Sequence, residues 1–287
     1  MDTQLMRWPA PAKLNLFLHI LGRLPNGYHQ LQSLFQMLDF GDELTFEINP
    51  NGMICMREPL AGVNDEDNLI IRAARLLQQR SQSPLGVTIG LTKRLPMGGG
   101  IGGGSSDAAT TLLALNYLWQ TGLSEDELAE LGLTLGADVP VFIRGRTAFA
   151  NGVGEQLIPL PQPEYYYVVL APNCHVSTAE VFGYADLPRN TQPIGPERYD
   201  FDTTRNDCQE RVFALYPEVA NAFGWLLEYA PSRMTGTGAC VFARFTDRQQ
   251  AEECFAARPT HLGGFVAKGV NESPVITLLA TLQEKSK

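Results

Sequence analysis

Several segments of the chain alternate apolar residues with other side chains, which is the period of a β-strand. In the segment AKLNLFLHIL, for example, a leucine stands at every second position from Leu14 to Leu18. Apolar runs such as YYYVVLAP lack this alternation and are typical of strands buried on both faces. The two patterns predict strands over residues 12–21, 42–48, 86–93, 165–172 and 240–245.

Other segments repeat apolar residues every three or four positions, as amphipathic helices do. One of them begins with Ser124 and carries Glu127 three residues later, which is the pattern of a capping box. The predicted helices cover residues 67–80, 105–119, 124–131, 208–230 and 247–258. Because strands and helices are interspersed without a regular strand–helix–strand series, the pattern favours an α+β fold over a doubly wound parallel sheet.

A turn-rich stretch, IPLPQPE at residues 158–164, separates the two halves of this pattern. Proline and glycine clusters of this kind mark loops between structural units. We therefore expect two domains, one over residues 1–158 and one over residues 159–287. A chain of 287 residues is long enough for both.

Composition narrows the class of protein. Lysine and arginine number 22 against 31 aspartate and glutamate residues, a net charge of -9 that disfavours general binding to nucleic acid. No apolar run is long enough for a membrane span, and no leader peptide is evident. The cysteines lack the spacing of a zinc site and indicate reduced thiols in a cytoplasmic enzyme; they are Cys55, Cys174, Cys208, Cys240 and Cys254.

The most unusual segment is the glycine stretch from Gly98 to Gly104, in which six of seven residues are glycine. It lies between a predicted strand and a predicted helix that Ser105 or Ser106 can cap. The first turn of a helix has free N–H groups and the positive end of the helix dipole, and glycine lets phosphate oxygens approach the backbone. The stretch therefore predicts a phosphate cradle, with Asp107 as a first-turn partner of the dipole.

Other interpretations of this stretch are less consistent with its neighbours. A P-loop needs lysine after the last glycine, where Ser105 stands. Gly98, Gly100 and Gly103 fit a dinucleotide motif, but the region about 20 residues on looks helical instead of ending a strand in an acid. The motifs of protein kinases are absent. A flexible hinge or a tight helix-packing loop remains the structural alternative.

Three segments together resemble the GHMP kinases, the group that contains galactokinase, homoserine kinase and mevalonate kinase. They are PAKLNLFLHILGRLPNGYHQLQS, PMGGGIGGGSSDAA and MTGTGACVFARF. The segments GYHQLQS, GADVPVFIRGRTAFANGVGE, LPRNT and RNDCQERV resemble one branch in particular. That branch transfers the γ-phosphate of ATP to the 2-hydroxyl of a cytidyl-diphosphate-linked methylerythritol, in non-mevalonate isoprenoid precursor synthesis. The resemblance implies a two-domain α+β fold with an active-site cleft between the domains.

The resemblance also implies the catalytic residues. It makes Asp138 the general base and Lys13 the catalytic lysine, a cation that favours the ionised carboxylate and the developing alkoxide. Without it, Asp138 fits a helix-cap carboxylate and Lys13 a solvated lysine at a strand edge. Asn15, two residues beyond Lys13 on the same strand face, is implied as a substrate ligand.

The remaining implied residues divide between the two substrates. The nucleotide side takes Asn68, Lys93, Pro96, Met97, Gly98, Gly99, Gly100, Ile101, Gly102, Gly103, Gly104, Ser105 and Ser106. The acceptor side takes Tyr28, His29, Thr178 and Phe182, with Tyr28 stacked on cytosine and His29 reading the edge of the base. A neutral His29 can present an acceptor nitrogen to the amino group of cytosine. Gly236 and Gly238 are expected to line the cleft through their backbone.

Magnesium is expected to arrive with ATP, because it prefers a few protein ligands plus phosphate oxygens; no carboxylate cluster identifies those ligands. Two alternatives stay open at this point. Another GHMP kinase, of the homoserine or mevalonate type, lacks support from the segment GYHQLQS. A nucleotide-binding protein that has lost catalysis is disfavoured by the presence of Lys13 and Asp138.

Overall fold

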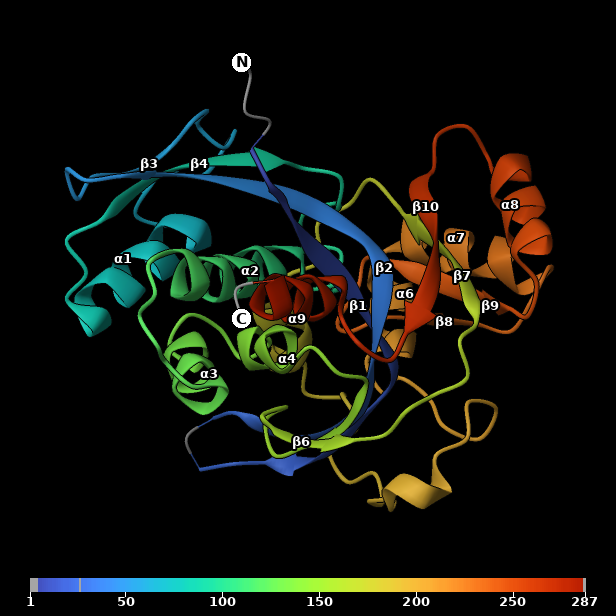
Figure 1. Cartoon of the computed structure of the whole chain (residues 1–287). Helices are drawn as coiled ribbons and strands as arrows, with labels where there is room; N and C mark the ends of the chain where they lie inside the picture. The colour runs from blue at the N-terminus through green and yellow to red at the C-terminus, as the bar shows by residue number, and fades with distance from the viewer. Residues whose placement is uncertain (1–4, 26, 286–287) are drawn as a thin grey trace.

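Two long antiparallel strands lie at the centre of the fold. β1 (Arg7–Arg23) and β2 (His29–Asn49) pair along most of their length in the computed structural model, which describes residues 5–25 and 27–285. Both strands curve through the middle of the molecule and separate two groups of helices (Figure 1). β1 extends the predicted strand in both directions, because its pairing with β2 continues past the alternating segment.

The first half of the chain builds one layer of helices against this pair. Its helices are α1 (Leu69–Ser81), α2 (Gly103–Leu118), α3 (Glu125–Leu133) and α4 (Val139–Arg144). Its strands are β3 (Ile54–Met56), β4 (Gly86–Thr92), β5 (Ala148–Asn151) and β6 (Gln156–Pro159). α3 begins with the predicted capping box of Ser124 and Glu127, which the structure confirms. The strands are antiparallel except for the pair of β3 and β4.

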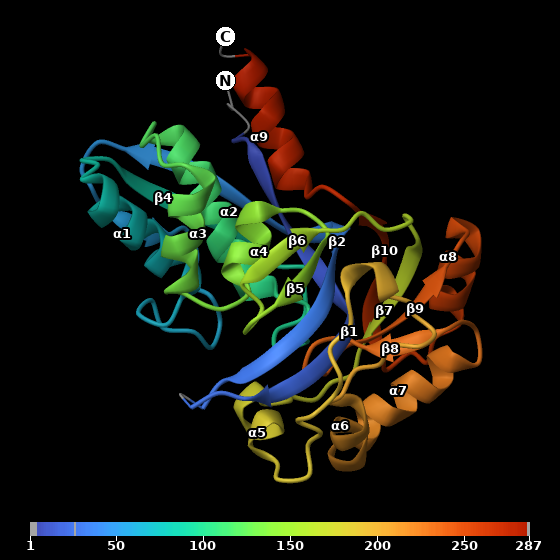
Figure 2. The same ribbon diagram turned by 90° about the horizontal axis from the view of Figure 1, so that it is seen from below.

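The second half forms an antiparallel arrangement of its own with helices on its outer side (Figures 1 and 2). Its strands are β7 (Tyr166–Ala171), β8 (Ser232–Met234), β9 (Val241–Phe245) and β10 (Gly263–Val270). Its helical elements are α5 (Thr178–Gly183), η1 (Pro196–Arg198), α6 (Gln209–Leu215), α7 (Pro217–Leu227) and α8 (Arg248–Ala257). β10 pairs with β2 at Leu38 and Met37, which joins the strands of both halves into one sheet.

The single helix predicted over residues 208–230 is wrong. The chain leaves the helical conformation at Tyr216, which ends α6 and immediately precedes Pro217 at the start of α7. Proline disfavours the helical conformation of the residue before it and has no N–H to continue the hydrogen-bond series. The predicted domain boundary stays a prediction, and residues 160–165 connect β6 to β7 there.

β1 passes through three apolar clusters, which explains why its simple alternation is misleading. Trp8 and Ala10 belong to the first-half cluster, Leu14 and Phe17 to a central cluster, and Ile20 to the second-half cluster. Because neighbouring elements cover both faces of the strand, polar residues between the apolar ones are buried as well.

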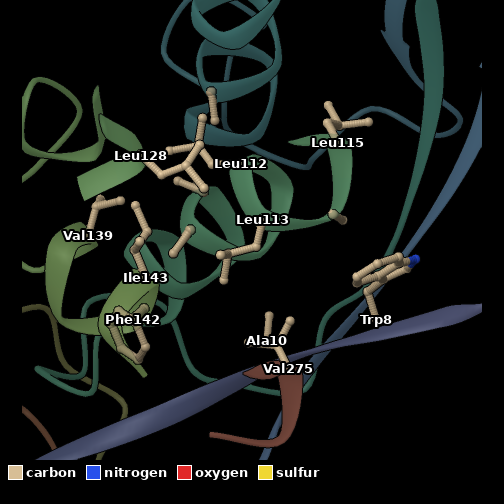
Figure 3. Close-up of a cluster of buried hydrophobic side chains, with 14 of the residues drawn as sticks. Trp8, Ala10, Leu112, Leu113, Leu115, Leu128, Val139, Phe142, Ile143 and Val275 are labelled. Carbon is tan, nitrogen blue, oxygen red and sulfur yellow. The ribbon is translucent and has the colours of Figure 1, made fainter. Parts of the chain in front are cut away.

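The last helix, α9 (Pro274–Lys285), returns to the first half of the chain. Its Val275 lies with Ala10 and Phe142 in the first-half cluster (Figure 3). Figure 1 shows this helix, in red, beside the blue and green elements. Among the described residues, no helix has both the length and the apolar character needed to cross a membrane.

Candidate active site

Lys13 and Asp138 meet where β1 passes the start of α4. The Nζ atom of Lys13 lies 3.3 Å from a carboxylate oxygen of Asp138. It also donates to the side-chain oxygen of Asn15 at 2.6 Å and to the carbonyl of Gly100 at 3.3 Å. The Lys13 side chain is only 3% exposed, which rules out the alternative of a solvated lysine at a strand edge. Burial on both faces of β1 keeps this cation at a fixed position.

Asp138 precedes α4 as its N-cap residue, but its side chain makes no capping hydrogen bond. The carboxylate is 38% exposed and faces Lys13. This geometry rules out the alternative in which Asp138 is a cap carboxylate, and it leaves one carboxylate beside a buried ammonium group. A carboxylate at this position can accept a proton from a substrate hydroxyl held beside it.

The glycine stretch turns directly into α2, and it does so earlier than the serine caps predicted. Gly98, Gly100 and Gly102 have φ values of 71°, 73° and 76°, the left-handed region that favours glycine. Gly102 is the N-cap residue and α2 begins at Gly103, so the predicted capping by Ser105 or Ser106 is wrong. The chain needs no side-chain cap here, and the first-turn N–H groups stay free for an anion.

Lys93 lies beside this loop together with the buried carboxylates of Asp42 and Asp107. The Nζ atom of Lys93 donates to Asp42 at 2.6 Å and to Asp107 at 2.9 Å. Burial lowers the pKa of Lys93, but Asp107 and Asp42 outweigh burial and raise it. For Asp107, burial raises the pKa to about 7, with Lys93 opposing and Asp42 reinforcing the effect. The expectation that Asp107 serves the dipole in the first turn is wrong, because α2 begins at Gly103 and Asp107 lies beyond that turn.

Two cavities converge on the Lys13–Asp138 pair. A cavity of about 390 Å³ runs along the glycine loop and is lined by Asn68, Lys93, Pro96, Met97, Gly98, Gly99, Gly100, Gly102, Gly103, Gly104 and Ser105, among others. A cavity of about 700 Å³ is lined by Lys13, Asn15, Tyr28, His29, Thr178, Phe182 and Gly236, among others. Gly100, Ser105 and Asp138 belong to both walls. The structure thus brings most of the predicted site residues together.

Three predicted residues lie outside both cavity walls. Ile101 is buried in the central apolar cluster, and Ser106 is fully buried within α2. Gly238 is turned toward Met234 and Val212 in the second-half cluster, and its backbone packs against Gly100. Its role is to support the glycine loop from behind, so the expectation that Gly238 lines the cleft is not met.

The far end of the larger cavity is built from β2 and α5. The rings of His29 and Phe182 stack with their centroids 4.9 Å apart and an interplanar angle of 19°. Tyr28 is 62% exposed beside them, and the hydroxyl groups of Thr178 and Thr237 lie 2.8 Å apart. A flat aromatic surface with polar groups at its edge is suited to a planar heterocycle.

Comparison with known proteins identifies the family. Residues 68–146 match the GHMP kinases N terminal domain, and residues 195–262 match the GHMP kinases C terminal domain. A 4-diphosphocytidyl-2-C-methyl-D-erythritol kinase from Pseudoalteromonas atlantica is 62% identical over 282 residues, which cover 98% of this chain and 99% of the relative. The chain belongs to the 4-diphosphocytidyl-2-C-methyl-D-erythritol kinase family.

Two further comparisons agree with this assignment. A kinase of the same name from Shewanella woodyi is 58% identical and covers 98% of this chain and 100% of the relative. A crystal structure of 4-(cytidine 5'-diphospho)-2C-methyl-D-erythritol kinase has a TM-score of 0.82 and 34% identity, with 92% of this chain and 99% of that chain covered. These comparisons confirm the predicted α+β GHMP kinase fold and the prediction that the chain is a kinase.

Sequence reasoning missed several groups that this member of the 4-diphosphocytidyl-2-C-methyl-D-erythritol kinase family brings to its site. Asp42 lies on β2, far in sequence from the lysine it binds, and no local pattern marks it. Thr237 lies between the two glycines that were predicted and supplies a hydroxyl to the cavity wall. Arg189 belongs to the segment LPRNT, which signalled the family but not a contact with His29.

Proposed function

We propose that this protein transfers the γ-phosphate of ATP to the 2-hydroxyl of 4-diphosphocytidyl-2-C-methyl-D-erythritol. The observation that carries the proposal is the Lys13–Asp138 pair at the junction of the two cavities. Phosphoryl transfer needs two substrates held end to end with the reacting oxygen beside a base. The smaller cavity along the glycine loop suits the phosphates of a nucleoside triphosphate, and the larger one suits the acceptor.

ATP is held mainly by backbone groups in this proposal. The N–H groups of Gly103, Gly104 and Ser105 occupy the first turn of α2, where they lack partners within the helix. They bind phosphate oxygens with the help of the helix dipole. Lys93 and Asn68 stand on the same cavity wall and face the nucleotide.

The transfer step uses Asp138 as the base and Lys13 as the fixed cation. Asp138 accepts the proton of the 2-hydroxyl while the hydroxyl oxygen forms a bond to the γ-phosphorus. The bond between that phosphorus and the oxygen bridging it to the β-phosphate breaks, and ADP leaves. The ammonium group of Lys13 stabilises the negative charge on the acceptor oxygen. Its other two contacts, to Asn15 and Gly100, keep it in position while this charge develops.

Magnesium fits this arrangement as an ion that arrives with ATP. The described residues contain no group of three or more histidine, cysteine, aspartate or glutamate side chains that could hold a metal. Magnesium needs only one or two protein oxygens when phosphates and water complete its shell. Ser105, which lines both cavities, would hold it. When bound, it would neutralise charge on the β- and γ-phosphates.

The acceptor cavity supports a cytidyl-linked substrate. We assign the base to the faces of Phe182 and Tyr28, with His29 at its edge, because aromatic faces contribute roughly 1–3 kcal/mol per stacked base. Asn15 stands next to Lys13 and lies where the sugar alcohol reaches the catalytic pair. All five cysteines are free thiols, which agrees with the cytoplasm as the proposed compartment.

An acceptor-dependent ADP assay tests this function. The purified protein is mixed with ATP, magnesium and the cytidyl-linked acceptor, and ADP release is measured with and without the acceptor. We expect ADP only with the acceptor present, and a product that carries one new phosphate at the 2-position. Homoserine and mevalonate serve as competing acceptors. Turnover of either at a comparable kcat/KM, or ADP release that ignores the acceptor, would refute the proposal.

A further inference from the structure

We propose that Arg189 is a positioning residue that fixes His29 as the tautomer with its proton on Nδ1, and thereby makes the site select cytosine over uracil. This inference rests on the proposed function, because it concerns the base of the acceptor. Arg189 comes from the segment LPRNT, and nothing in the transfer step requires it. Its guanidinium group nevertheless donates to His29 and Phe182 on the acceptor wall and to three carbonyls just beyond it.

The hydrogen bond between Arg189 and His29 determines where the imidazole proton lies. The Nε atom of Arg189 donates to Nε2 of His29 at 3.0 Å. Arginine stays protonated and has no acceptor, so Nε2 must accept and cannot carry a proton. The neutral ring then holds its proton on Nδ1, which has no hydrogen-bond partner within residues 5–25 and 27–285.

The same contact disfavours the imidazolium form of His29, because its Nε2–H would point at the Nε–H of Arg189. Burial lowers the pKa of His29, and the neighbouring charges of Arg189 and Arg23 lower it further. Within the described part of the chain, no carboxylate raises this pKa. His29 therefore stays neutral at neutral pH, with Nδ1 as a donor and Nε2 occupied.

This proton position corrects the expectation that His29 offers an acceptor nitrogen to cytosine. The nitrogen at position 3 is an acceptor in cytosine and carries a proton in uracil. The Nδ1–H group of His29 can donate to N3 of cytosine, but it would face the N3–H donor of uracil. An unmatched buried polar group costs about 1–3 kcal/mol, which corresponds to roughly 5- to 150-fold in affinity.

Arg189 also holds the aromatic partner of His29. One terminal nitrogen donates to the carbonyls of Phe182 at 3.0 Å and Tyr184 at 2.5 Å. The other donates to the carbonyls of Ala185 at 3.2 Å and Leu187 at 3.0 Å. These carbonyls follow or end α5, which carries Phe182. One side chain thus sets both the ring that stacks and the proton that reads the base edge.

The proton position can be measured without any substrate. Two-bond ¹H–¹⁵N spectra of ¹⁵N-labelled ligand-free protein distinguish the two tautomers, and a His29→Asn variant assigns the signals among the four histidines. We expect the Nδ1–H tautomer at pH 7 and an apparent pKa below 6.5. Arg189→Met should mix the tautomers, and Arg189→Lys, which keeps a donor, should restore part of the preference. An Nε2–H tautomer in the wild type would overturn the inference, whether or not the variants fold.

Binding of CDP and UDP tests the selectivity, with isothermal titration calorimetry as the assay. The wild type should bind CDP at least about 5-fold more tightly, and Arg189→Met should lose most of this preference. Arg211→Met is the matched control, because Arg211 pairs with Asp186 and lies over the Tyr184 ring without contacting His29. Equal binding of CDP and UDP by the wild type, or an unchanged ratio in Arg189→Met, would overturn the inference. An enzyme that selects CDP but transfers no phosphate would instead contradict the proposed function.

Discussion

Replacing Gly104 by alanine separates the effect of the glycine loop on folding from its effect on ATP. Gly104 lies in the first turn of α2 with an ordinary helical conformation, and an added Cβ would meet only Leu69 Cδ1, at 3.6 Å. That distance is normal van der Waals contact, so the side chain fits. Both Gly104 and Leu69 line the nucleotide cavity, so the new methyl group occupies space that a phosphate needs.

The two effects have opposite signs, and their magnitudes follow from the structure. Alanine is favoured over glycine in a helix by up to about 1 kcal/mol, so the ligand-free protein should become slightly more stable. A hydrogen bond to a charged group contributes about 1.5–3 kcal/mol. Losing one N–H contact to phosphate should therefore weaken ATP binding by roughly 10- to 150-fold.

Gly224→Ala is the matched control, because Gly224 lies in α7 with nothing within 4 Å of an added Cβ. Calorimetry gives Tm without ligand, and titration with a non-hydrolysable ATP analogue gives Kd. Both variants should show an unchanged or higher Tm, and only Gly104→Ala should lose affinity. If Gly104→Ala bound the analogue within twofold of the wild type, the first turn of α2 would not be the phosphate site.

Three other perturbations test separate parts of the site. Asp138→Asn should lower kcat by about 10²–10⁴-fold with little change in either KM, and adding Lys13→Met should cost less than the product of the single losses in steady-state assays. Burial raises the pKa of Asp107 to about 7, so its contribution to stability is present below 3.8 and is lost as pH rises through 7. Asp107→Asn should therefore add up to roughly 4 kcal/mol of stability and raise Tm at pH 8, add less at pH 5, and have no effect on Tm at pH 3. Tyr28→Ala should raise KM for cytidyl- and uridyl-linked acceptors alike, since every base has a stacking face; an effect on only one acceptor would contradict this.

The strands and helices with strong periodicity were predictable from sequence. Two helix boundaries were predicted wrongly, each for its own physical reason. The break at Tyr216 could have been found, since Pro217 disfavours a helix at the residue before it. The start of α2 could not, because φ of Gly102 depends on how the loop packs. A Cβ on Gly102 would lie 2.6 Å from the ring of Phe142, a residue forty positions later in the chain.

The candidate site was predictable where residues belong to a recognisable segment and not where contacts join distant segments. Lys13 and Asp138 came from such segments, but the burial of Lys13 depends on elements that cover both faces of β1. The contact between Arg189 and His29 spans 160 positions of the chain. Periodicity and spacing carry no information about pairs of this kind, because tertiary packing brings them together.

The return of α9 to the first half affects how the chain can fold as it is synthesised. The cluster that begins at Trp8 is completed by Val275, so its apolar surface stays partly open until the last helix has left the ribosome. Transiently exposed apolar surface of this kind makes a partly folded chain prone to aggregation. A change that displaces α9 would therefore destabilise the cluster around Trp8, more than 260 residues earlier in the chain.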